Sequence, residues 1–225
     1  MPTGSWTNAQ SWIDLCFLHW RVEEAELRAF VPDSVELETH DGSVWLGVTP
    51  FLLRNFRLRG LPPLPGISTF PEVNVRTYVT RDGKPGIWFF SLDAASRLAV
   101  EAAKKLYKLP YYHAQMRYER GEELVQYESA RPGAAFSARY RGDGELFQPA
   151  VGTLEHFLTD RYCLYTEDGG RLYRAEIQHA PWALQRGEAR IDLNTMAPLP
   201  LPAGEPHVLF SPRQDVVLWS LDEVE

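Results

Sequence analysis

Four Asp-Gly pairs divide the chain into short segments, and turns at this spacing strongly limit the folds open to it. The pairs are Asp41-Gly42, Asp82-Gly83, Asp143-Gly144 and Asp168-Gly169. Asp-Gly between alternating apolar runs is typical of a β-hairpin, because both residues tolerate a positive φ angle. The flanks agree, since residues 173–178 alternate between apolar and polar side chains as a half-buried strand does. The sequence therefore predicts a fold dominated by antiparallel sheet.

Helical patterns are fewer and shorter. Residues 22–31 stop at a proline, residues 96–108 carry apolar side chains on one side, and residues 152–165 repeat them at helical spacing. A few helices among many hairpins indicate the α+β class, with the sheet rolled into a barrel or cone. The Pro-rich stretches 61–66 and 198–206 are too short to separate domains, so we expect residues 1–225 to form a single domain.

Composition argues against several classes of partner. The net charge of -7 repels phosphate backbones, and no basic patch is long enough to outweigh it, so we expect no nucleic acid partner. The N-terminus lacks the features of a secretory signal, and no apolar run approaches the ~18 residues that span a bilayer. We therefore expect a cytoplasmic protein without a membrane partner. Cys16 and Cys163 are then better interpreted as reduced core residues than as a disulfide.

Common catalytic and cofactor motifs are absent from the sequence. There is no Gly-x-Gly-x-x-Gly after a predicted strand, no phosphate loop, no Gly-x-Ser-x-Gly elbow and no His-Glu-x-x-His. The six histidines occur singly, without the spacing of metal ligands. We expect neither a cofactor nor a metal site.

One predicted strand carries an unusual polar face. In residues 70–76 the polar side chains of Glu72, Asn74 and Arg76 alternate with valines, and the period of a strand places all three on one face. Inside a barrel this face would line a pocket, whereas at the edge of a sheet it would face solvent. The sequence leaves both interpretations open.

A second candidate segment follows the helix predicted over 96–108. Pro110 fixes the exit from the helix, and Tyr111, Tyr112 and His113 then bring two phenols and an imidazole together. Stacked aromatic core residues would give the same pattern, so the residue types alone do not assign a function.

Several segments resemble acetoacetate decarboxylases, in the same order over most of the chain. They are the aromatic-Arg pair and short helix at 19–32, the segment 103–112, Pro181-Trp182, and Met196-Ala197-Pro198-Leu199. The runs 71–79 and 89–94 are more similar to the YqjF-like family of bacterial proteins of unknown function, within the acetoacetate decarboxylase-like superfamily. The resemblance implies a cone-like antiparallel barrel with flanking helices. It also admits a homo-oligomer, since many decarboxylases of this fold assemble, although no residue here carries that property across.

The resemblance implies roles for particular residues. Arg21 falls on the arginine that helps to hold the substrate carboxylate in decarboxylases, and Glu72 best matches a pocket glutamate of that family. The Schiff-base lysine and its neighbouring lysine fall on Tyr111 and Tyr112, which cannot form an imine with a ketone. The lysines at 104–105 lie about two helical turns earlier, roughly 10 Å along the axis, and do not replace them.

Three functional interpretations fit these residues. The first is an enzyme that acts on an oxo-acid or related carboxylate without a Schiff base, by lyase or hydratase-like chemistry, with Glu72, Tyr111 and Tyr112 as its catalytic groups. The residues then expected to bind this substrate are Arg21, Asn74, Arg76, His113 and Trp182. The second is a non-catalytic domain that senses or carries a small carboxylate or an aromatic metabolite. The third is structural, with Arg21 and Glu72 as a buried ion pair and the tyrosines as core residues.

Overall fold

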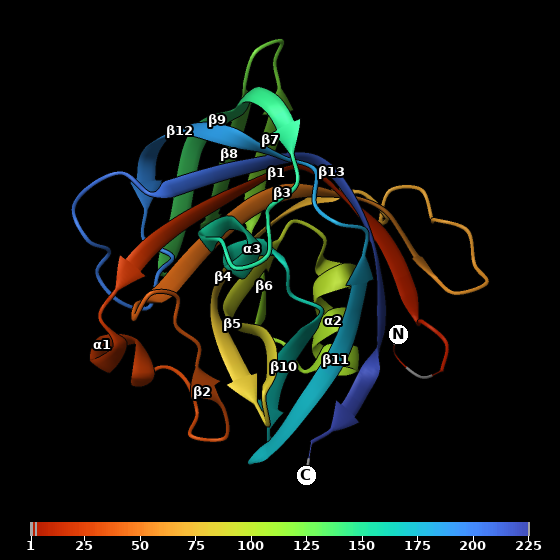
Figure 1. The fold of residues 1–225 in the computed structure, drawn as a ribbon. Coiled ribbons are helices and arrows are strands. Elements are labelled where there is room, and N and C mark those ends of the chain that lie inside the picture. The colour runs from red at the N-terminus through yellow and green to blue at the C-terminus, as the bar shows by residue number, and fades with distance from the viewer. Residues whose placement is uncertain (1, 3, 225) are drawn as a thin grey trace.

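Strands make up most of the computed structural model, which describes residues 2 and 4–224 (Figure 1). The strands are β1 (Asn8–Val22), β2 (Glu36–Leu37), β3 (Val44–Leu58), β4 (Phe70–Arg81), β5 (Lys84–Ala94), β6 (Tyr111–His113), β7 (Gln115–Arg120), β8 (Val125–Arg131), β9 (Ala134–Phe147), β10 (Cys163–Asp168), β11 (Arg171–His179), β12 (Leu184–Asn194) and β13 (His207–Glu223). The helices are α1 (Glu24–Arg28), α2 (Arg97–Tyr107) and α3 (Leu154–Thr159). The predicted β-rich α+β class with few helices is confirmed.

The sheet closes on itself. Its order runs β1-β3-β4-β5-β10-β11-β13, and β13 also pairs with β1, so these strands form a ring, while β12, β9, β8 and β7 continue outward from β13 (Figure 1). Most pairs are antiparallel as predicted, but β5 pairs in parallel with both β6 and β10. The reason is that β6 is reached through α2 and β10 through α3, and such crossovers allow parallel pairing.

Two of the four Asp-Gly pairs form turns, a third begins at the end of β10 before a turn formed by Gly169 and Gly170, and the remaining pair does not lie in a turn. Asp82 and Gly83 join β4 to β5 with φ angles of 51° and 74°, the positive values expected for a tight hairpin. The turn predicted at Asp143-Gly144 is wrong, because this pair lies within β9. Strand β12 pairs with β9 on both sides of it across a register shift, so the positive φ of Gly144 belongs to a bulge in a long strand.

The third predicted helix is shorter than the sequence pattern suggests. Thr153 caps α3 through its side-chain oxygen, but the helix ends at Thr159 rather than near residue 165. The end of the predicted span forms β10, because Cys163 and the residues after it pair with β11. Tertiary pairing thus overrides a helical spacing of apolar side chains over the last residues of the segment.

Two layers of apolar packing lie on opposite faces of the ring. Val73 and Val75 of β4 pack outward with Tyr127 and Phe136 of the β7–β8–β9 side. Phe51 and the neighbouring rings pack inside the ring. Alternate residues of β4 therefore belong to different environments, and this positions the site described below.

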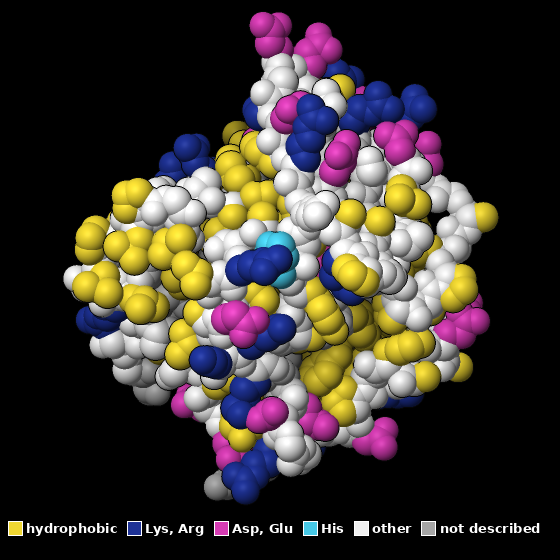
Figure 2. Space-filling model, turned by 180° about the vertical axis from the view of Figure 1, so that it is seen from behind, with side chains coloured by type: hydrophobic (Ala, Val, Ile, Leu, Met, Phe, Trp, Pro, Cys, Tyr) yellow, Lys and Arg dark blue, Asp and Glu magenta, His cyan; other side chains and the backbone are white. Residues whose placement is uncertain are grey.

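The Pro-rich segment 61–66 is a surface connection between two paired strands. It links β3 to β4, which are neighbours in the sheet. Apolar side chains gather over this connection at the left of Figure 2, where Leu58, Leu61 and Leu64 are exposed. The segment therefore joins two neighbouring strands of one sheet.

The cysteines and helices bear on two of the sequence-based expectations. Cys16 and Cys163 are both free and buried, as expected for core residues. None of the helices found in residues 2 and 4–224 combines the length and the apolar character needed to cross a bilayer.

Candidate functional site

The candidate site is a cavity of about 110 Å³ inside the ring. Its walls come from β1, β3, β4, β5 and α2, together with residues of β10, β11 and β13. Most of the wall is apolar, and much of it is aromatic: Trp12, Phe51, Phe56, Phe70 and Phe89 all contribute. A small enclosed and largely apolar space with a few polar groups is the usual form of a small-molecule site.

Strand β4 contributes the polar face that the sequence predicted. Glu72, Asn74 and Arg76 all line the cavity and are 4%, 6% and 5% exposed. The alternative of a solvent-facing edge is wrong, because β4 lies between β3 and β5 in the ring. Thr49 of β3 is paired with Asn74 and adds another polar side chain to the same wall.

Glu72 and Tyr111 form a hydrogen-bonded pair in this cavity. The Tyr111 hydroxyl donates to both carboxylate oxygens of Glu72, at 3.4 Å and 3.3 Å. Burial, with a smaller contribution from the nearby charge of Asp93, raises the pKa of Glu72 to about 8, although the hydrogen bond from Tyr111 lowers it. Burial and the proximity of Glu72 also raise the pKa of Tyr111 well above its ordinary value. At neutral pH the pair is therefore mainly a carboxylic acid and a phenol.

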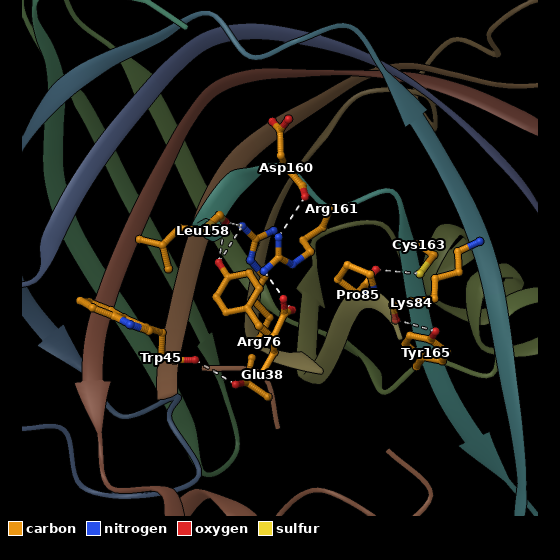
Figure 3. Close-up of polar contacts among 12 residues, drawn as sticks. Glu38, Trp45, Arg76, Lys84, Pro85, Leu158, Asp160, Arg161, Cys163 and Tyr165 are labelled. Carbon is orange, nitrogen blue, oxygen red and sulfur yellow. Dashed lines mark hydrogen bonds and ion pairs between the residues drawn. The ribbon is translucent and has the colours of Figure 1, made fainter. Parts of the chain in front are cut away.

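Arg76 is a buried cation without a carboxylate partner. Its guanidinium donates to the Leu158 carbonyl at 3.3 Å and to the Tyr78 hydroxyl at 3.5 Å, and it lies 5.2 Å from the centre of the Phe17 ring. None of the ion pairs formed by residues 2 and 4–224 includes Arg76. The neighbouring Arg161, by contrast, is paired with Glu38 at 3.0 Å (Figure 3).

Several other buried polar atoms around the cavity also have no partner. They are Oδ1 of Asn8, Nε1 of Trp12, Oγ1 of Thr49, Oδ1 of Asn74 and Nε of Arg76. Buried polar groups in proteins are nearly always hydrogen-bonded, so these atoms are available to bind a polar ligand or water in the cavity. Donors and acceptors are both present, and the partner that fits them carries both kinds of atom or is accompanied by water.

The structure separates Arg21 from this cavity. Arg21 is exposed, its guanidinium lies 5.5 Å from the centre of the Trp45 ring, and it lines a different surface hollow beside residues 202–207. The buried Arg21–Glu72 ion pair of the structural interpretation is therefore not formed. The arginine of the cavity is Arg76, which strand periodicity, and not the match to the decarboxylase arginine, placed on the pocket face.

Three further predicted residues also lie outside the cavity. Tyr112 is 41% exposed, and the Arg131 guanidinium lies 4.0 Å from the centre of its ring. Side chains alternate along β6, so Tyr111 lines the cavity and Tyr112 does not. His113 is half-buried and does not line the cavity. Trp182 is a core residue whose indole N–H donates to the Thr159 carbonyl at 2.8 Å.

No lysine reaches the cavity. The chain contains only Lys84, Lys104, Lys105 and Lys108. Lys84 is paired with Glu176, Lys104 with Glu101 and Lys108 with Asp168, while Lys105 is exposed on α2. None of the four is among the residues that line the cavity. An imine with a ligand in this space has no amine to form it.

Sequence reasoning did not identify the contributions of β1, β3 and α2. Thr49 and Trp12 sit in apolar strands, and only the pairing of those strands shows that they face Asn74 and Phe51. The small residues Ala99, Ala102 and Ala103 on the inner side of α2 carry no functional signal by themselves. Within residues 2 and 4–224, no group of three or more His, Cys, Asp or Glu side chains is placed to hold a metal ion.

Comparison with known proteins places this chain among its relatives. Residues 9–215 match the DUF2071 family, described as an uncharacterized conserved protein. The chain belongs to the DUF2071 family. This DUF2071 protein is also 44% identical over 227 residues to the uncharacterized protein YqjF of Bacillus subtilis (strain 168), covering 98% of this chain and 94% of that one. The predicted YqjF-like membership is confirmed.

Solved structures with the same fold are enzymes of the acetoacetate decarboxylase type. The enduracididine biosynthesis enzyme MppR, complexed with pyruvate, superimposes with a TM-score of 0.69 at 13% identity, over 100% of this chain and 92% of that one. The acetoacetate decarboxylase of Legionella pneumophila superimposes with a TM-score of 0.67 at 12% identity, over 100% of this chain and 92% of that one. An acetoacetate decarboxylase-like enzyme from Sphingomonas wittichii RW1 superimposes with a TM-score of 0.69 at 13% identity, over 99% of this chain and 94% of that one. These likenesses establish the fold of the DUF2071 protein.

Proposed function

We propose that this protein is an enzyme that binds a small oxo-acid and catalyses proton transfer at the carbon next to its carbonyl, without an imine. Lyase, hydratase, aldol-type and tautomerase reactions on oxo-acids can all begin with this step. The observation that carries the proposal is the unpaired Arg76 in the same cavity as the Glu72–Tyr111 pair. The absence of a lysine from the cavity wall supports the exclusion of imine chemistry.

Arg76 supplies the binding half of the proposal. A buried charge is costly unless it is paired, and this guanidinium donates hydrogen bonds to neutral groups, with aromatic rings and the cation of Arg161 nearby. A ligand carboxylate would neutralise it and form charge-assisted hydrogen bonds with the planar guanidinium. The raised pKa of Glu72 makes it mainly neutral near pH 7, so it does not cancel the charge of Arg76 before the ligand arrives.

Glu72 and Tyr111 supply the chemical half. The ionised form of Glu72, a minor fraction at pH 7 because its pKa is about 8, accepts the proton from the carbon next to the carbonyl. The electron pair of that C–H bond forms a C=C bond, and the carbonyl π pair moves onto oxygen. The Tyr111 hydroxyl turns from Glu72 to donate a hydrogen bond to this enolate oxygen. Return of a proton from Glu72 to carbon completes the exchange.

The choice of an oxo-acid is also supported by one structural neighbour. MppR has been solved with pyruvate and with the condensation product of pyruvate and imidazole 4-carboxaldehyde, both bound to that enzyme. At 13% and 12% identity the likeness covers the fold, so the ligand class comes to this chain only as part of the proposal.

The test is hydrogen–deuterium exchange of the ligand in D₂O, followed by NMR. Pyruvate and 2-oxo-4-phenylbutanoate are expected to lose their C3 protons faster with the protein than without it. Glu72→Gln is expected to slow this exchange by about 100-fold or more, as removal of a general base does. Arg76→Met is expected to weaken binding strongly, whereas Arg21→Met, a matched loss of one arginine outside the cavity, is expected to leave both quantities unchanged.

The controls separate catalysis from binding. Exchange that persists in Glu72→Gln, or that is absent from the wild-type protein, would contradict the catalytic role. Binding without exchange would indicate instead a protein that carries or senses small carboxylates. Equal affinities of Arg76→Met and wild type would contradict the binding site itself.

A further inference from the structure

The inner side of α2 leaves space that larger side chains would fill. Ala99, Ala102 and Ala103 line the cavity, with Leu106 one turn further along the helix. Figure 1 shows α2 inside the curve of the strands. Because alanine side chains are short, the backbone of α2 lies close to the cavity while little side-chain volume projects into it.

Aromatic rings form another part of the cavity wall. Phe51 and Phe70 belong to the apolar cluster on which Ala99 and Trp12 also pack, and the Trp12 and Phe51 rings lie 5.6 Å apart. Phe89 of β5 continues this wall. The lining therefore combines the alanines of α2 with aromatic rings and with aliphatic side chains such as Leu92 and Ile177, and the rings suit a flat apolar group.

The charges of the cavity restrict the ligand further. Arg76 is the one cation among the lining residues, all of which are described, and Glu72 is the one acidic group. A ligand with a single carboxylate would balance Arg76. A second carboxylate would lie in an apolar space with no cation to pair with it, where burial disfavours it.

We infer that the cavity selects an aromatic monocarboxylic acid over an aliphatic acid with the same number of carbon atoms. The ring lies between the alanine side of α2 and the aromatic wall, and the carboxylate contacts Arg76. The volume of about 110 Å³ is of the same order as an apolar cavity of about 150 Å³ that takes up benzene. This inference rests on the proposed carboxylate site at Arg76 and adds the shape of the remainder of the ligand.

Access to the cavity is past α2. Ala102 and Leu106 line the cavity and are also exposed at the surface, so the opening lies along this helix. Val100 is the residue of α2 that is buried. The alanines are thus both the wall of the site and part of its mouth, which makes them the positions where ligand size is set.

The test compares matched acids by titration calorimetry on the full chain. Phenylacetate is paired with octanoate and 3-phenylpropanoate with nonanoate, so each pair has equal carbon numbers. The aliphatic member of each pair removes more apolar surface from water on binding. A cavity that binds through apolar burial alone would therefore favour the aliphatic acid. We expect each aromatic acid to bind about tenfold more tightly than its partner, through contacts with the ring wall.

Variants of α2 locate the selectivity. Ala103→Leu is expected to weaken binding of the aromatic acids by tenfold or more, because the added side chain fills the space for the ring. Lys105→Leu makes a similar change on the exposed side of the same helix and is expected to leave affinity unchanged. Ala99→Leu is the second cavity variant, and thermal melting identifies any variant that does not fold.

The outcomes distinguish failure of the aromatic selectivity from failure of the carboxylate site. Octanoate binding as tightly as phenylacetate, or unchanged affinity in both folded alanine variants, would overturn the aromatic selectivity while leaving the carboxylate site in place. Absence of binding by all four acids, or equal affinity of Arg76→Met and wild type for them, would overturn the carboxylate site and the selectivity together.

Discussion

At the scale of single residues, Glu72 connects the site to the stability of the protein. Its pKa is raised on folding from 4.5 to about 8, so between these values the native state holds a proton that the unfolded chain has released. The free energy of unfolding contributed by this group therefore falls as pH rises through that window. Glu72→Gln removes the titration and should be increasingly stabilising relative to wild type as pH rises.

The expected size of this effect can be measured by denaturant unfolding at pH 5 and pH 8.5. The difference in unfolding free energy between Glu72→Gln and wild type should grow by about 2–4 kcal/mol between the two pH values. Glu122→Gln, at an exposed glutamate, is the control and should show no such growth. A constant difference across the pH range would mean that Glu72 is ionised in the native protein.

Tyr111 gives a second prediction at this scale. The contacts of its hydroxyl with Glu72 are 3.3 Å and 3.4 Å long, so Tyr111→Phe should change the unfolding free energy by no more than about 1 kcal/mol. The same hydrogen bond lowers the pKa of Glu72, and its loss should shift upward the pH at which proton exchange of the oxo-acid accelerates. A variant that unfolds, or one with an unshifted pH profile, would remove Tyr111 from the site.

The sequence and the structure agree best on residues whose placement follows from strand periodicity. Glu72, Asn74 and Arg76 share a face because side chains alternate along any strand, and no knowledge of the remaining fold is needed. Arg21 shows the limit of resemblance between distant relatives. Arg21 matches the decarboxylase arginine by its place in the order of motifs along the sequence. The position of its side chain, however, depends on packing against Trp45, which lies outside the motif.

At the scale of elements, α2 is the part of the site with the least support. Ser96 caps the helix by accepting from the Ala99 amide at 3.3 Å, and Val100 is its buried residue. Elements with few buried contacts open at a lower free energy than the whole domain. We expect amide hydrogens of residues 100–107 to exchange with solvent faster than those of the central residues of β3.

Ser96→Ala tests this view of α2. Loss of a helix cap costs about 1 kcal/mol, and this should accelerate exchange in α2 by roughly fivefold while leaving β3 unchanged. Hydrogen exchange followed by mass spectrometry resolves the two segments. An equal acceleration in both would mean that α2 opens only when the entire protein unfolds.

Elements with strong local signals were predicted well, and those set by long-range pairing were not. The helix at 96–108 has a cap, one apolar side and a following proline, and α2 matches it within a residue or two. The span 152–165 had helical spacing throughout, yet its last residues pair with β11. The strand order, which brings Thr49 beside Asn74, also depends on contacts that no local pattern encodes.

At the scale of the whole molecule, closure of the ring brings the site together from distant parts of the chain. Asn8 near the start and Leu218 near the end are paired in β1 and β13, and both line the cavity. The acetoacetate decarboxylase-like fold is thus kept, while the cavity wall contains Tyr111 and no lysine. The four lysines of the chain all lie elsewhere.

This arrangement predicts the result of reductive trapping. An imine forms when an uncharged amine reaches a carbonyl carbon, and Lys84, Lys104 and Lys108 are held in ion pairs outside the cavity. Borohydride added with acetoacetate or pyruvate should therefore leave the intact mass unchanged under conditions that label a Schiff-base decarboxylase. A stable adduct on one lysine, abolished by its substitution with arginine, would show that the chain can bring an amine to the ligand. The exclusion of imine chemistry would then be wrong.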